Sequence, residues 1–285
     1  MLSCFNRLRG ILRSAFINES RPLSLFAKPF DLSKRSFMGK SPERVPVLTL
    51  YQYEICPYCA KVKAFLDFFR VPYTTCEVNP LTKSQLGAVD FRQRKVPFAV
   101  FRDGNQGESG LIIESLKFRG YIDFDNSADL SEYRKWCNYV DKDLSVLLFP
   151  NITRNLTESW EAFSYIQLVP TFTMMEKVLN RVLGSIAMVL ASGKIKRKYN
   201  IQDEREQLLK VVSIWKTALE GEKFKGGAKP NEIDLLVFGT LRAVEDLKAH
   251  RWLLSEGGSE LKDWYMSMSE LVGPRHVGRI KRVCG

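Results

Sequence analysis

The spacing of apolar positions divides the chain into two regions. Between residues 45 and 124, short apolar runs alternate with segments of helical spacing, whereas residues 131–272 show helical spacing throughout. Strands are expected at 45–53, 73–78, 96–101 and, short and polar, after the Asp103-Gly104 turn. Helices are expected at 59–69, at about 83–91 and from 109 onwards. This order, βαβαββα, predicts an α/β thioredoxin-like N-terminal domain.

The second region predicts an all-α domain over 131–272, joined to the first through a polar linker at 125–130. Its most apolar segment is 173–191, which Lys177 and Arg181 interrupt. The uncharged part is therefore shorter than the ~20 residues that span a bilayer. We expect a core or dimer helix here, with membrane contact as the alternative.

Two cysteines, Cys56 and Cys59, separate the first predicted strand from the first predicted helix. Cys56 precedes the first helical turn, where unpaired N–H groups and the helix dipole favour a thiolate. Pro57 suits the first helical position because its missing N–H has no partner there. The arrangement predicts a nucleophilic Cys56 with a lowered pKa and a buried partner, Cys59.

Two other interpretations of this cysteine pair remain open. Structural zinc would need a second ligand pair, but the other cysteines are scattered, and His250 and His276 are not spaced as a pair. The other interpretation is that Cys56 and Cys59 are two ordinary buried cysteines without a chemical role. Because strand, Cys-Pro-Tyr-Cys and helix occur together, the redox or nucleophilic interpretation is favoured.

The charge distribution argues against a nucleic-acid-binding function. The chain has 285 residues and a net charge of +11, of which residues 1–44 carry +6 and residues 271–285 carry +4. The body between is nearly neutral, whereas a nucleic-acid surface should lie on the folded part. Six cysteines without regular spacing do not indicate a secreted disulfide framework.

The N-terminal segment, 1–44, has the composition of a mitochondrial presequence. It is rich in arginine and poor in acidic residues, and Leu8, Ile11 and Leu12 recur at helical spacing. The alternatives are a disordered basic tail in the cytoplasm and an amphipathic anchor on an endomembrane such as the Golgi. Residues 273–285 are expected to form a second basic tail.

Three further positions resemble parts of a ligand site. Pro97, at the start of the third strand, is either a cis-proline after Val96 or an edge-strand proline. Glu108 and Ser109 stand at the start of a helix, where such residues are typical caps. A helix N-terminus can equally bind a ligand carboxylate.

Several runs resemble the membrane-associated prostaglandin E synthase 2 family, which is related to glutaredoxins and glutathione transferases. In the N-terminal half these runs are Leu50–Tyr53, Cys56–Asp67, Glu77–Pro80 and Arg94–Pro97. In the C-terminal half they include Gly226–Asn231 and Val237–Gly239. The resemblance covers about residues 45–270.

The resemblance implies a glutathione-transferase-like dimer that isomerises prostaglandin endoperoxide H2, a lipid, to prostaglandin E2. Cys56 would be the catalytic thiol and Cys59 its partner, with Tyr53 hydrogen-bonded in the thiol site. For glutathione, the backbone of Val96 before Pro97 would bind the cysteinyl part. Glu108, where the family usually has Asp, and Ser109 would bind the γ-glutamyl part. Some members hold haem together with glutathione, with the glutathione thiol as the iron ligand and no metal ligand from the chain.

The function expected from these observations is that of a glutathione-binding prostaglandin E synthase, an isomerase. The rival enzyme is a glutaredoxin-like or omega-like thiol–disulfide oxidoreductase that uses Cys56 and Cys59. A third, non-enzymatic interpretation is a protein that holds haem or an iron–sulfur cluster. Peripheral membrane contact is a further expectation, and a nucleic-acid partner is not expected.

Overall fold

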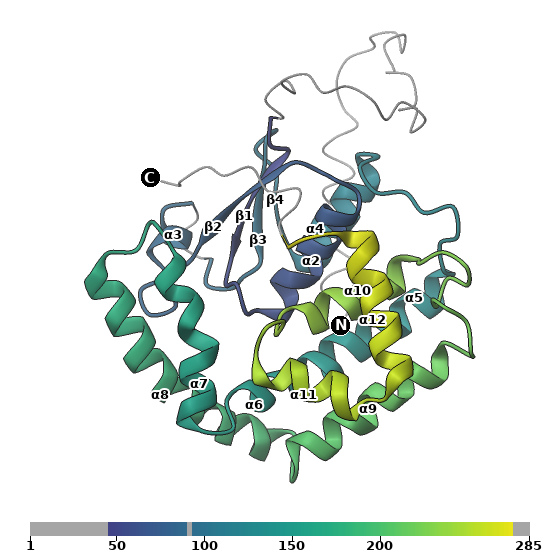
Figure 1. The fold of residues 1–285 in the computed structure, drawn as a ribbon. Coiled ribbons are helices and arrows are strands. Elements are labelled where there is room, and N and C mark those ends of the chain that lie inside the picture. Colours follow the sequence, from purple (N-terminus) through teal and green to yellow (C-terminus); the bar gives the residue numbers. More distant parts are fainter. Residues whose placement is uncertain (1–44, 90–92, 276–285) are drawn as a thin grey trace, which may run out of the picture. The chain divides into compact units, whose positions relative to one another are not determined.

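A four-stranded mixed sheet forms the N-terminal layer in the computed structural model, which describes residues 45–89 and 93–275 (Figure 1). Its strands are β1 (Leu48–Gln52), β2 (Tyr73–Glu77), β3 (Phe98–Phe101) and β4 (Gln106–Glu108). Their order is β2-β1-β3-β4; β1 and β2 are parallel, and β3 is antiparallel to β1 and β4. The predicted presequence, within 1–44, lies outside the described residues, as does the end of the basic tail, 276–285.

The helices of this layer are α2 (Pro57–Phe68), α3 (Ser84–Gly87) and α4 (Ser109–Phe118). The predicted βαβαββα order and the thioredoxin-like fold are therefore confirmed. α3 is shorter than the predicted helix over 83–91: it begins after Lys83, whose backbone is left-handed, and its C-cap is Ala88.

The strand register brings the chemistry-bearing segments to one edge of the sheet. Gln52 at the end of β1 is paired with Glu77 at the end of β2. Phe98 at the start of β3 lies opposite Tyr51 on one side and opposite Glu108 on the other. The segments that leave β1, β2 and β4, and the one that enters β3, consequently meet at this edge.

The rest of the described chain is helical, as predicted. Its elements are α5 (Leu130–Tyr139), a π-helix η1 (Val140–Leu144), α6 (Ser145–Ile152), α7 (Leu156–Ala162), a 3-10 helix η2 (Phe163–Leu168), α8 (Met174–Lys198), α9 (Glu204–Ala218), α10 (Glu232–Arg242), α11 (Lys248–Glu256) and α12 (Ser259–Val272). A hydrophobic core runs from the sheet through α2 into these helices.

Helix α10 connects the two layers, because it is buried along its whole length and packs against α2. Asn231 caps α10: its side chain accepts the N–H groups of Ile233 and Asp234, while Asp234 accepts the N–H of Asn231. Gly239 permits the close approach, since a Cβ there would lie 2.7 Å from the Cα of Lys61. The reactive helix is thus fixed from behind by α10.

By residue type alone, Ser131 would cap the first helix of the all-α region and Pro150 would end it, but the structure differs at both positions. Asp129 caps α5 by accepting the N–H groups of Ser131 and Glu132. Pro150 does not end its helix but lies inside α6, which continues for two residues to Ile152. Because Pro150 has no N–H, α6 lacks one backbone hydrogen bond. The helix ends two residues later, so little of it is disturbed.

Helix α8 does not form the apolar core that its composition predicts. Its buried residues are Asn180, Gly184, Ser185 and Ser192, whereas most of its large apolar side chains, such as Met175, Leu179 and Leu190, are exposed. The expectation of a core helix is therefore wrong for the apolar positions, because close packing against α7 and η2 selects small residues for the inner face.

Candidate active site

Cys56 occupies the N-cap position of α2, with Pro57 at the first helical position. The N–H of Cys56 donates to the Tyr53 carbonyl at 3.1 Å, which closes the turn that leaves β1. Cys56 as a residue is partly exposed, whereas Cys59, one turn into the helix, is completely buried. The order of burial is the predicted one, with Cys59 as the inner partner.

The environment separates the pKa values of the two thiols. The Cys56 pKa is lowered, chiefly by a hydrogen bond from the Cys59 side chain, then by the N–H groups of Cys59 and Tyr58 and by the Lys63 charge; burial opposes them. The Cys59 pKa is raised well above its ordinary value, mainly by burial and then by its bond to Cys56. Both cysteines are free. The pair therefore favours a thiolate at Cys56 and a thiol at Cys59.

Tyr53 lies beside this pair as a protonated phenol. Burial raises its pKa to about 12, and negative charge at Cys56, Cys59 and Glu77 adds to the effect. At neutral pH the hydroxyl therefore keeps its proton and can donate it to a developing oxyanion.

The peptide bond between Val96 and Pro97 is cis, so the cis-proline interpretation is confirmed. If the antiparallel pairing of Tyr51 with Phe98 is continued by two residues, Val96 comes opposite Tyr53. Both Val96 and Tyr53 pack against the small apolar cluster of Val78, Leu86 and Phe98. The cis-proline segment thus borders the thiol site.

Glu108 and Ser109 reach the same edge of the sheet from β4 and α4. Glu108 is the N-cap residue of α4, but its side chain makes no capping hydrogen bond, and Ser109 begins the helix. The expectation of an ordinary side-chain cap is therefore wrong for Glu108. Its side chain is exposed and that of Ser109 is partly exposed, so both are accessible to a ligand.

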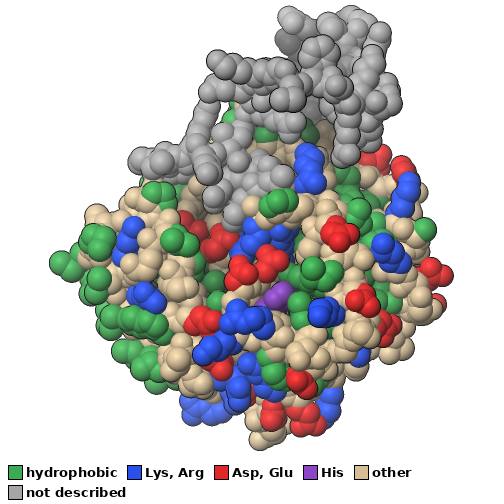
Figure 2. All heavy atoms as spheres, in the orientation of Figure 1, with side chains coloured by type: hydrophobic (Ala, Val, Ile, Leu, Met, Phe, Trp, Pro, Cys, Tyr) green, Lys and Arg blue, Asp and Glu red, His purple; other side chains and the backbone are tan. Residues whose placement is uncertain are grey.

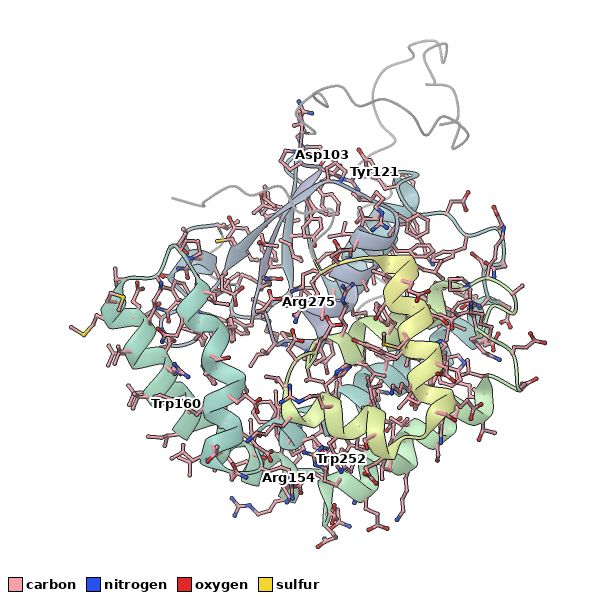
Figure 3. The ribbon with its side chains drawn as sticks, viewed as in Figure 1. Asp103, Tyr121, Arg154, Trp160, Trp252 and Arg275 are labelled. Atoms are coloured by element: carbon pink, nitrogen blue, oxygen red, sulfur yellow. The ribbon has the colours of Figure 1, made fainter. Side chains whose placement is uncertain are left out.

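A buried polar cluster behind the thiol is the main feature that the sequence interpretation missed. The Gln52 side-chain amide donates to Glu54 at 2.8 Å and to Glu77 at 3.0 Å. Glu54 also pairs with Lys63 at 3.0 Å and with Arg275, labelled in Figure 3, at 2.6 Å. The signal in the sequence was two lysines, Lys61 and Lys63, inside the predicted helix of the thiol.

Glu77 holds a proton in this cluster. Burial and the neighbouring Glu54 raise its pKa to about 8, while Lys63, the Glu54 N–H and Gln52 act in the opposite direction. At pH 7 the pair of carboxyl groups consequently carries less than its full negative charge, which limits repulsion of the nearby thiolate.

The helical part supplies further groups that sequence reasoning did not assign. Tyr58 donates to the Asp141 carbonyl at 3.0 Å, and Lys61 pairs with the Asp141 side chain at 2.6 Å. Tyr165 in η2 has a pKa well above its ordinary value because of burial, with smaller effects from Glu77, Glu54, Tyr53 and Cys56. Tyr165 therefore faces the thiol site from the side of the helices.

The interpretation of the cysteine pair as a zinc site requires further ligand side chains close to the pair. Within 45–89 and 93–275, no three side chains of His, Cys, Asp or Glu come together as a ligand set. Cys4, His276 and Cys284 lie outside these ranges.

Comparisons with known proteins place this geometry in a class. A family model for the glutathione S-transferase N-terminal domain matches residues 50–119. A glutathione S-transferase from Rhodospirillum rubrum is similar in structure, with 16% identity, coverage of 78% of this chain and 87% of that one, and a TM-score of 0.50. A beta-etherase from a Sphingobium strain gives 15% identity, coverage of 78% and 95%, and a TM-score of 0.52. The fold is that of glutathione transferases.

The sequence relatives are more specific. Prostaglandin E synthase 2 of Mus musculus is 30% identical over 273 residues, which cover 79% of this chain and 70% of the relative. The Danio rerio protein of the same name is 32% identical over 269 residues, with coverage of 78% and 70%. This chain belongs to the prostaglandin E synthase 2 family.

Proposed function

We propose that this protein is a glutathione-dependent thiol enzyme that isomerises prostaglandin endoperoxide H2 to prostaglandin E2. The observation that carries the proposal is a partly exposed Cys56, held at a helix N-terminus with its pKa lowered by Cys59. Family membership supports the reaction class, because the relatives are named prostaglandin E synthases.

The residues at the sheet edge fit glutathione. The Val96 backbone would pair with its cysteinyl part next to Cys56, and Glu108 and Ser109, at the start of α4, would bind the γ-glutamyl end. The accessible α4 N-terminus favours a carboxylate, because its first N–H groups have no partner within the helix. Bound glutathione would supply a second thiol beside Cys56.

The first proposed step breaks the weak O–O bond. The Cys56 thiolate attacks one peroxide oxygen, an S–O bond forms, and the electron pair of the O–O bond moves to the second oxygen. That oxygen takes a proton and becomes the hydroxyl group of the product. Tyr53, whose pKa is about 12, is protonated at neutral pH and is the proposed donor.

The second step restores the thiolate. A base removes the hydrogen from the ring carbon that bears the sulfur-bound oxygen, a C=O bond forms, and the S–O electrons return to sulfur. Atoms and electrons balance, so the reaction needs no external oxidant or reductant. Cys59 remains a thiol throughout and stabilises the Cys56 thiolate by donating to it.

The test compares the purified full chain with three variants in an endoperoxide assay that separates prostaglandin E2 from products of spontaneous decay. Cys56→Ser should reduce formation to the spontaneous level, and Tyr53→Phe should lower kcat. Cys59→Ala should retain part of the activity, because it removes a stabilising donor rather than the nucleophile. Full activity in Cys56→Ser would refute the mechanism.

Glutathione binding is tested separately by calorimetry. Glu108→Ala and Ser109→Ala should weaken binding, whereas Glu114→Ala, an exposed position further along α4, should leave Kd unchanged. Equal Kd values for all three variants would remove these residues from the proposed glutathione site.

A second candidate, a thiol–disulfide oxidoreductase, is favoured by the direct Cys59–Cys56 hydrogen bond, since such a pair can form a disulfide. A disulfide-reduction assay separates the two functions: loss of reduction in Cys59→Ser together with undetectable isomerisation would favour the oxidoreductase. Haem with glutathione as its iron ligand is tested by a Soret band after both are added. The iron ligand would then be the glutathione thiol and not a side chain of this site.

A further inference from the structure

The chain returns to the thiol site after its last helix. α12 ends at Val272, and Gly273 follows with a φ of +82°, in the left-handed region that favours glycine. The Val272 carbonyl accepts a hydrogen bond from Arg70, which lies just after α2. The Gly273 carbonyl accepts one from Arg242, the last residue of α10, at 2.7 Å. Two arginines from different elements thus fix the direction in which residues 273–275 leave α12.

This path brings Arg275 to the segment that follows β1. The Arg275 guanidinium lies 2.6 Å from Oε1 of Glu54, and its Nε lies 3.8 Å from a carboxylate oxygen of Glu245. The side chains of Arg275 and Glu54 are 24% and 19% exposed, so solvent screens their ion pair only in part. Figure 2 shows basic and acidic side chains side by side in the middle of the face on which Figure 3 labels Arg275.

The two carboxylate oxygens of Glu54 have different partners. Oε1 is held by Arg275, whereas Oε2 accepts hydrogen bonds from Lys63 at 3.0 Å and from Gln52 at 2.8 Å. A carboxylate that bridges two cations neutralises neither of them completely, because it carries a single charge. Lys63 therefore keeps part of its positive field, and this field acts on the Cys56 thiolate.

The other titratable groups in this region do not replace Lys63. Those that act on Cys56 are the Cys59 thiol and the protonated tyrosines Tyr53, Tyr58 and Tyr165. Glu77, which acts on two of these tyrosines, holds a proton at pH 7 because its pKa is about 8. Around Arg275, besides its two glutamate partners, lie Lys63, Asp67, Arg242 and the buried His250. Of these described groups, Lys63 is the one that brings positive charge to the thiol.

We propose that Arg275 is a positioning residue for the Cys56 thiolate, acting from the C-terminal segment through Glu54 and Lys63. By holding Oε1 of Glu54, Arg275 leaves the Lys63 ammonium with part of its charge uncompensated. Without Arg275, Lys63 would pair with Glu54 as a neutral couple, and the thiolate would be stabilised less. The effect on isomerisation rests on the proposed function, whereas the effect on the reactivity of the thiol does not.

The experiment follows alkylation of the full chain by iodoacetamide as a function of pH, with the label on Cys56 quantified by peptide mass spectrometry. Arg275→Gln removes the charge, so the alkylation midpoint should move to higher pH. Arg275→Glu should move it further, because it adds a negative charge beside Glu54. Arg275→Lys keeps the charge and should restore most of the wild-type profile.

The matched control is Arg119→Gln. Arg119 forms a 2.5 Å ion pair with Asp103, and its side chain is 22% exposed, close to the value for Arg275. Asp103 follows the end of β3, which pairs with the start of β1, so this ion pair lies at the edge of the sheet opposite Cys56. The control should alkylate with the wild-type midpoint. An equal shift in Arg119→Gln and Arg275→Gln would assign the effect to loss of stability and overturn the proposal.

A double-mutant cycle tests the route through Glu54. Adding Arg275→Gln to Glu54→Gln should shift the midpoint far less than Arg275→Gln does alone, because the bridging carboxylate is already absent. A full shift in the Glu54→Gln background would refute this route. An unchanged midpoint in Arg275→Gln would overturn the positioning role itself, even if thermal unfolding showed a lower Tm.

The wild-type isomerase assay separates this inference from the proposed function. A shifted midpoint together with no formation of prostaglandin E2 by the wild type would support the positioning role and refute the proposed function. An active wild type whose midpoint does not respond to Arg275→Gln or Arg275→Glu would refute the positioning role alone.

Discussion

The Lys63 ammonium lies 3.0 Å from the Glu54 carboxylate, and the two side chains are only 5% and 19% exposed. Glu54 is also held by Arg275 from the C-terminal segment. The charge of Lys63 lowers the pKa of Cys56, while Glu54 raises that of Glu77. The reactive thiol is therefore influenced by an ion pair that lies outside the Cys-Pro-Tyr-Cys motif.

The first prediction concerns this ion pair. Lys63→Met removes the charge but keeps most of the apolar stem, so the Cys56 pKa should rise. The measurement is the pH dependence of Cys56 alkylation by iodoacetamide. Lys61→Met is the matched control, because Lys61 is buried on the same helix but pairs with Asp141 across the layers. A rise of equal size in both variants would mean that general damage to α2, and not the charge of Lys63, sets the effect.

The second prediction isolates the hydrogen bond from Cys59. Cys59→Ala removes the donor that contributes most to lowering the Cys56 pKa, whereas Cys59→Ser leaves a hydroxyl in its place. A hydrogen bond to a charged group stabilises the charged form, so alanine should raise the Cys56 pKa. Serine should raise it less. If the two variants alkylate at the same rate across the pH range, the side-chain donor has no role.

The third prediction is a pH dependence of stability that comes from Glu77. Its pKa is raised from 4.5 to about 8, so the folded state binds the proton more tightly than the unfolded state. This contribution is complete at pH values below 4.5 and falls as the pH rises to about 8. The free energy of unfolding should decline over this window by up to about 1.4 kcal/mol per pH unit more in the wild type than in Glu77→Gln.

Urea unfolding at several pH values measures this difference. Gln is a neutral isostere of the protonated carboxyl group and does not titrate. The plot of unfolding free energy against pH should therefore be flatter for Glu77→Gln than for the wild type between pH 4.5 and about 8. Parallel curves for the two proteins would show that Glu77 titrates normally and that the buried cluster is fully charged.

The fourth prediction concerns the contact between α2 and α10. In Gly239→Ala the new methyl group would meet the Lys61 Cα at 2.7 Å and the Ala64 Cβ at 2.8 Å, so a helix must move. The cost should be about 1–3 kcal/mol of unfolding free energy. Gly193→Ala is the control, because no atom lies within 4 Å of its Cβ position and alanine should stabilise α8 by up to about 1 kcal/mol. Thermal unfolding of both variants checks the opposite signs.

The sheet and the thiol could be predicted because they depend on local patterns. Alternating apolar runs define β1 and β3, and Cys56 before Pro57 marks a helix start. The buried cluster could not be found in this way. Lys63, Glu54 and Glu77 are charged residues that local rules place at the surface, and only the pairing of β1 with β2 and the return of the chain at Arg275 bury them together.

Helix α8 is a case in which the sequence predicts the wrong environment for its side chains. Its composition predicts burial, and the residues that favour this prediction, such as Met175 and Leu190, are the exposed ones. Periodicity shows that a helix has two faces but does not show which face meets the protein, because that depends on the size of the neighbouring surface. Phe163 fills the space beside Gly184 and so sets the orientation of α8.

The contact at Gly239 has a consequence for anyone who wishes to transplant the reactive motif. Cutting the chain at the polar connection after residue 124 would strip α2 of its cover and expose Ala60 and Ala64, which are now shielded from solvent. Residues 45–124 are therefore not a portable thiol module. A working graft would have to carry α10 with it, because the support of the reactive helix comes from a segment far along the chain.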